Sequence, residues 1–192
     1  MDPAIWGPDQ WKVLFDVAKV YENCREERDA IGMKVCLQFL FSLGENFMCE
    51  HCGYFFLERL SLYNTGTDMV DWIYNLKSLV TNKIHICKEN VKHCNVDTLP
   101  QVPISRLQFY TRLHFEDFHL ESWIRNLILV YYQKESMEFF EISKRLFLDF
   151  IFKNNIEEGF ERDEIKSPDE FFEKLKPNYK EWLESYRLVQ VI

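Results

Sequence analysis

Apolar residues recur at intervals of three and four positions along most of this sequence, and this spacing constrains the fold more than any other feature. In the N-terminal segment, Trp11, Leu14, Phe15 and Ala18 would share one face of a helix. Aromatic residues make up 16% of the 192 residues, whereas glycine and proline number only 6 each. Many bulky side chains with few turn formers are typical of packed helices. The sequence therefore predicts an all-α protein.

The ends of the first predicted helices carry local signals. Pro8 and Asp9 suit a first helical turn, so we expect the first helix to begin near Pro8 and to leave Trp6 outside it. Gly44, Glu45 and Asn46 indicate the end of the second helix. Thr67 or Asp68 is expected to cap the fourth helix. The second to fourth helices are predicted over residues 26–43, 47–62 and 69–83.

Proline residues separate this N-terminal part from the rest of the chain. Residues 97–103 include Pro100 and Pro103 and are predicted to form a linker or domain edge. Beyond it, helical character continues over residues 104–118, 120–132 and 137–152. Ser167 and Pro168 are a good helix start, and Pro177 is expected to interrupt the last apolar face.

Cys49 and Cys52 form a Cys-x-x-Cys motif within the third predicted helical segment. Two intervening residues bring the sulfurs close enough to bond to each other, and a position just before the helix or in its first turn would favour the thiolate. Such a pair can cycle between dithiol and disulfide, or supply half of a zinc site. A structural disulfide is disfavoured, because so short a loop removes little unfolded-state entropy.

Charge and hydropathy exclude several classes of protein. The net charge is −8 with no block of lysine or arginine, so direct nucleic-acid binding has no electrostatic basis. No segment approaches the roughly 20 apolar residues of a membrane span. The N-terminus lacks a basic start and an apolar signal core, so we expect a protein that is not secreted. Its cysteines are then expected to be redox-active, metal-binding or buried.

The order of motifs resembles a known family. Trp-Gly-Pro-x-x-Trp at residues 6–11, then Cys-x-x-Cys, then a helix carrying Trp72, is similar to the Erv/ALR family of FAD-linked sulfhydryl oxidases over about residues 3–94. The resemblance is greatest to forms encoded by large DNA viruses. It implies an Erv/ALR-like bundle of four or five helices at residues 1–97, followed by a helical C-terminal domain of unknown role at residues 104–192.

The resemblance also implies an activity and its partners. Protein thiols would reduce the Cys49–Cys52 disulfide, FAD would take the electrons, and oxygen would accept them as hydrogen peroxide. Family orientation places Cys52 nearer the flavin and leaves Cys49 to exchange with substrate. Family members are commonly homodimers, and the viral forms make disulfides in virion proteins, which implies a location in the host cytoplasm or the virion.

The cofactor residues that the resemblance implies depart in part from the family pattern. The family's His-Asn-x-x-Asn motif falls here on residues 77–81, where its His and both Asn are replaced, and its second structural disulfide is not reproduced. Lys77 could instead meet the pyrophosphate as a point charge. The implied cofactor-binding residues are Trp6, Gly7 and Trp11 at the pocket entrance, with Tyr21, Trp72, Lys77, Ser78 and Thr81.

Two other functions remain open from the sequence. A degenerate oxidase fold without FAD could serve as a binding or assembly module, since the cofactor motif is altered. A zinc-binding structural protein would use Cys49 and Cys52 with Cys87 and Cys94, or with His85 or His93 as substitutes. The tryptophans suit core anchors as well as a flavin wall. Cys24 and Cys36 are expected to be small buried hydrophobes or free thiols.

Overall fold

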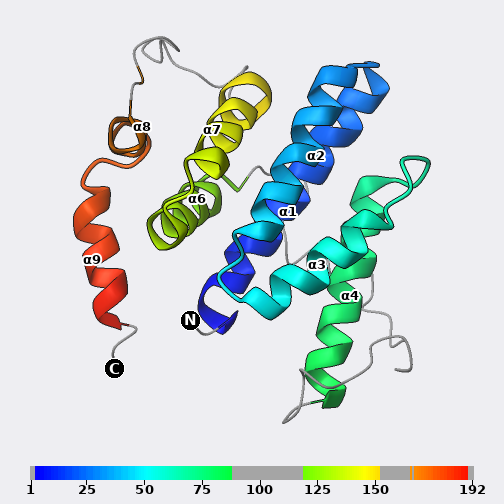
Figure 1. Cartoon of the computed structure of the whole chain (residues 1–192), viewed down its shortest axis with the longest axis horizontal. Coiled ribbons are helices and arrows are strands. Elements are labelled where there is room, and N and C mark those ends of the chain that lie inside the picture. Colours follow the sequence, from blue (N-terminus) through cyan, green and yellow to red (C-terminus); the bar gives the residue numbers. More distant parts are fainter. Residues whose placement is uncertain (1–2, 88–118, 152–164, 166, 190–192) are drawn as a thin grey trace.

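The fold is helical throughout the part of the chain that can be described, which confirms the all-α prediction (Figure 1). The computed structural model describes residues 3–87, 119–151, 165 and 167–189, and these contain eight α-helices and no strand. Only the backbone is described for residues 3–6, 82–87 and 186–189. The predicted linker at 97–103 and the segment 104–118 lie outside the described residues, and the division into two domains stays a prediction.

Four helices occupy the N-terminal part. They are α1 (Pro3–Glu26), α2 (Ala30–Glu45), α3 (Glu50–Ser61) and α4 (Met69–Cys87). Helices α1 and α2 lie side by side, α4 packs against α1, and α3 packs against α2 (Figure 1). The described residues include no helix that is long and apolar enough to cross a membrane.

The start of α1 differs from the prediction. The helix begins at Pro3 rather than near Pro8, so Pro8 lies inside it and Trp6 is part of it. Pro3 suits the first position because the first N–H groups of a helix have no partner within the helix. Pro8 has no backbone N–H, so one hydrogen bond is missing near the start of α1. The sequence pattern placed Pro8 in the first turn, where this bond would not have formed in any case.

The other helix ends follow local capping groups. The predicted start of α2 at residue 26 is wrong, because the chain turns at Arg28, whose φ of 58° is left-handed, and Asp29 then caps α2. The Asp29 carboxylate accepts the N–H groups of Ile31 and Gly32 at 3.1 and 2.9 Å. Asp68 caps α4, accepting the Asp71 N–H at 2.9 Å, as one of the two expected caps. Helix α4 continues four residues past its predicted end.

The C-terminal half begins with α6 (Leu120–Lys134) and α7 (Met137–Leu146), and a π-helical turn, η3 (Phe147–Ile151), continues α7. Helices α8 (Pro168–Leu175) and α9 (Tyr179–Val189) follow. Ser167 caps α8 by accepting the Glu170 N–H at 3.2 Å, which confirms that predicted start. The helical structure is interrupted between α8 and α9 around Pro177, as expected.

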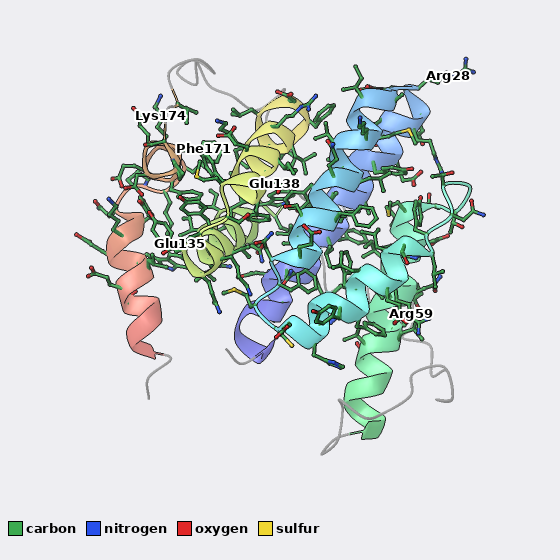
Figure 2. The ribbon with its side chains drawn as sticks, viewed as in Figure 1. Arg28, Arg59, Glu135, Glu138, Phe171 and Lys174 are labelled. Atoms are coloured by element: carbon green, nitrogen blue, oxygen red, sulfur yellow. The ribbon has the colours of Figure 1, made fainter. Side chains whose placement is uncertain are left out.

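Aromatic rings join the two halves into one continuous cluster of buried residues. Helix α6 packs against α1 and α7 against α2. Between them, the Trp123 ring lies 5.2 Å from Phe39 of α2 and 6.3 Å from Phe147 of η3. Phe171 extends from α8 toward α7 (Figure 2), where its ring lies 5.7 Å from that of Phe140.

Carboxylates on α1 fix the starts of two other helices. Two of them accept backbone N–H groups at the start of α4 or just before α6, which have no partner within the helix. The third accepts a side-chain hydroxyl in the first turn of α6. The three bonds join Asp9 to the Ser122 hydroxyl (2.8 Å), Asp16 to the His119 N–H (3.0 Å) and Glu22 to the Met69 N–H (2.6 Å). Helix α1 therefore positions α4 of the N-terminal half and α6 of the C-terminal half.

Candidate active site

The Cys-x-x-Cys motif lies where α3 begins. Cys49 is the N-cap residue, and its sulfur accepts the backbone N–H of Cys52 at 3.3 Å. This confirms that Cys49 ends the segment before the helix, although the predicted helix start at residue 47 is wrong. Both cysteines are thiols, half-buried against the core and near disulfide distance from each other. The pair is therefore placed for bond formation while remaining partly accessible.

A close contact between two glycines sets the position of this turn. A Cβ atom at Gly53 would lie 2.5 Å from the carbonyl oxygen of Gly44, on α2. A Cβ atom at Gly44 would in turn lie 2.6 Å from the side chain of Leu57. The absence of both side chains lets the start of α3 approach the end of α2. Residues 44–46, which the sequence indicated as the helix end, do end α2, with Asn46 as its C-cap, and Gly44 also provides this close contact.

A row of aromatic rings runs from the segment before Cys49 into the core. Neighbouring rings have centroids 5.1 to 6.2 Å apart, distances at which aromatic pairs attract. The row connects two predicted cofactor residues, Trp72 and Tyr21. In order it consists of Phe47, Phe56, Trp72, Tyr63 and Tyr21.

Tyr63 is a member of this row that the sequence pattern did not identify. It follows α3 in a segment read only as a turn, and its hydroxyl donates to the Thr67 carbonyl at 2.8 Å. Burial, and then the neighbouring Tyr21, raise the pKa of Tyr63 above its usual range. Its position between Tyr21 and Trp72 depends on tertiary packing, and no signal in the sequence would have revealed it.

Trp11 and Lys77 meet across α1 and α4. The Lys77 ammonium lies 4.8 Å from the centre of the Trp11 ring, which is a cation–π distance. Burial lowers the pKa of Lys77, and no carboxylate pairs with it among the described residues. A partly desolvated cation of this kind favours an anionic group beside it.

The neighbours of Lys77 on α4 include a second polar group. The Ser78 hydroxyl is buried and has no hydrogen-bond partner in the described part of the chain. Thr81 is half-buried one turn beyond Lys77. On α1, a Cβ atom at Gly7 would meet no atom within 4 Å, so the backbone there faces open space.

Trp11, Lys77 and Ser78 supply the kinds of group that bind a flavin dinucleotide. An aromatic face, a cation without a carboxylate and an unused hydroxyl match the ring, pyrophosphate and polar edges of such a cofactor. Tyr21 differs from them, because its side chain is 0% exposed and forms part of the core. The side chain of Trp6, also predicted at the cofactor, lies outside the described residues.

The zinc alternative finds no support from the described side chains, although its full ligand set is not among them. No group of three or more His, Cys, Asp or Glu residues that could hold a metal ion occurs in the described ranges. The side chains of His85 and Cys87, and residues His93 and Cys94, lie outside those ranges. The zinc site stays a prediction.

Comparisons with protein-family models, with curated proteins and with solved structures found no match to this sequence.

Proposed function

We propose that this chain is an FAD-dependent sulfhydryl oxidase that forms disulfides in protein substrates through Cys49 and Cys52. One observation carries the proposal: the Cys49 sulfur caps α3 and accepts the Cys52 N–H at 3.3 Å. A backbone N–H and the positive end of a helix both stabilise negative charge on sulfur. The position of the Cys49 sulfur at this helix start therefore suits the thiol–disulfide exchange of the proposed reaction.

The exchange begins with the pair in its disulfide form. A substrate thiolate attacks the Cys49 sulfur, a bond forms between these two sulfurs, and Cys52 leaves as a thiolate. A second substrate thiolate then attacks the substrate sulfur of this mixed disulfide and releases Cys49 as a thiolate. The substrate has lost two electrons and its two thiol protons, and Cys49 and Cys52 have gained the two electrons.

The electrons must then leave the cysteine pair. When bound, FAD supplies a two-electron acceptor that transfers them to oxygen and yields hydrogen peroxide. Trp11, Lys77, Ser78 and Thr81 would hold it, with Gly7 leaving room beside the ring. Lys77 would bind its phosphates, in place of the polar residues that the family carries there.

A binding module that has lost the cofactor is the second candidate. The full burial of Tyr21 favours it, because a ring enclosed by protein side chains offers no surface to a flavin. In that case the aromatic row would serve only to pack α3 and α4 on α1. The two candidates differ in whether electrons can leave the cysteine pair.

Catalytic thiol consumption separates these candidates. The purified full chain is supplied with FAD and dithiothreitol, and oxygen uptake and peroxide are measured. We expect turnover that is abolished in Cys49→Ser and in Cys52→Ser, and retained in Glu58→Gln, an exposed residue of the same helix. Turnover that persists in both serine variants, or no turnover in the wild type, would overturn the proposal.

A further inference from the structure

A second pair of cysteines lies at the turn between α1 and α2. Cys24 is 5% exposed and Cys36 is 0% exposed. The Cys24 thiol is among the groups that raise the pKa of the Cys36 thiol, so the two side chains lie near each other. A Cβ atom on Gly32 would lie 2.5 Å from the Cys24 sulfur. Because Gly32 and Cys36 are four residues apart on α2, they share a face of that helix, and the Cys24 sulfur lies against this face.

The surroundings of the pair restrict access to it. A Cβ atom on Gly32 would also lie 2.7 Å from the Phe150 ring, so η3 covers the same place. Burial raises the pKa of the Cys36 thiol well above its ordinary range, and the Cys24 thiol and the Asp29 carboxylate raise it further. In the folded protein the Cys36 thiol therefore reacts slowly with reagents and disulfides, since only the thiolate exchanges. The Cys24 thiol is also buried, which restricts access to it.

We propose that Cys24 and Cys36 form a second, structural disulfide that fastens the end of α1 to the start of α2. The reaction requires a disulfide donor, such as oxidised glutathione, before η3 covers the turn. One cysteine thiolate attacks the donor and releases one thiol, and the other attacks the mixed disulfide and releases the second. The pair loses two protons and two electrons, and the donor becomes two thiols.

This pair is separate from the Cys-x-x-Cys motif. Cys36 lies in the first half of α2, whereas Cys49 follows the other end of that helix. Ten residues of helix from Cys36 to the cap at Asn46 correspond to roughly 15 Å. The two pairs therefore do not exchange directly within one chain, and the structural disulfide does not depend on the proposed oxidase activity.

Peptide mapping identifies the bond. The full chain is unfolded, refolded in a glutathione redox buffer, treated with N-ethylmaleimide and digested with trypsin and a glutamate-specific protease. Cleavage after Glu45 separates Cys36 from the Cys-x-x-Cys motif. We expect residues 23–25 and 35–45 as one cross-linked species, lighter by two hydrogen atoms than the two peptides together. Recovery of both peptides as blocked thiols would overturn the proposal.

Thermal unfolding supplies a second readout. The refolded, oxidised protein should melt roughly 5–10 °C above the protein kept in dithiothreitol, as expected for a disulfide that closes a loop of this size. Cys24→Ala and Cys36→Ala should each lose this redox-dependent difference. The double variant Cys49→Ser/Cys52→Ser should keep it. A difference that survives in Cys24→Ala would assign the effect to another pair and contradict the proposal.

Discussion

Two properties of Lys77 matter for the proposed cofactor site. It is half-buried on the Trp11 ring, and no carboxylate pairs with it among the described residues. Burying a cation without a counter-charge costs free energy, and a bound phosphate would recover part of that cost. At the residue scale, a substitution of Lys77 is therefore the most direct test of the proposed cofactor site.

Lys77→Met should weaken FAD binding about tenfold, which corresponds to about 1.4 kcal/mol. Methionine keeps an apolar chain against Trp11 but removes the charge. Titration of the apoprotein with FAD, followed by flavin fluorescence, gives the affinity. Lys34→Met, at an exposed position on α2, is the control and should bind as the wild type does. Equal affinities for the two variants would exclude Lys77 from the site.

At the element scale, the start of α3 determines the geometry of the cysteine pair. The turn depends on the Cys49 cap and on the approach of Gly53 to the Gly44 carbonyl. A side chain at position 53 would have to displace backbone, which cannot yield as a flexible side chain can.

Gly53→Ala should lower the free energy of unfolding by about 1–3 kcal/mol, the usual cost of overpacking. Urea denaturation measures this change. Gly7→Ala is a matched helical control, since its Cβ atom would meet nothing within 4 Å. Alanine is the better helix former, so this variant should be as stable as the wild type or up to about 1 kcal/mol more stable. Equal stability of the two variants would contradict the packing argument.

Local signals in the sequence predicted the elements better than their contacts. Ser167 and Pro168 marked the start of α8 because capping depends only on neighbouring residues. Pro8 misled the prediction for α1, because the sequence pattern assigns it to the first turn. The helix begins earlier, at Pro3, and continues through Pro8. The proximity of Cys24 to Cys36, and of Tyr63 to Trp72, arises from tertiary packing and has no spacing rule in the sequence.

At the scale of the whole molecule, the C-terminal helices are attached through a cluster of polar groups around Asp169. Its carboxylate accepts hydrogen bonds from the hydroxyls of Tyr132, on α6, and Tyr179, on α9, the latter at 2.6 Å. Lys180 pairs with it at 3.1 Å. The tyrosine bonds, and then the lysine, lower the pKa of Asp169 to about 2.

This attachment should weaken in acid. A carboxyl whose folded pKa is depressed stabilises the fold above its unfolded pKa of about 4, and this contribution is lost as the pH falls toward 2. Thermal melts between pH 5 and 2 should therefore show a steeper loss for the wild type than for Asp169→Asn. Glu184→Gln, an exposed carboxylate on α9, should follow the wild type. Parallel curves for wild type and Asp169→Asn would contradict this account.

The visible absorption spectrum of the purified full chain tests the proposed oxidase most directly. The account predicts the yellow absorption of oxidised flavin after incubation with FAD and removal of the unbound cofactor. Without oxygen, a dithiol should bleach this band in the wild type, whereas Cys52→Ser should stay yellow because its electrons have no route from the cysteine pair. A colourless protein that retains no added FAD would contradict the account.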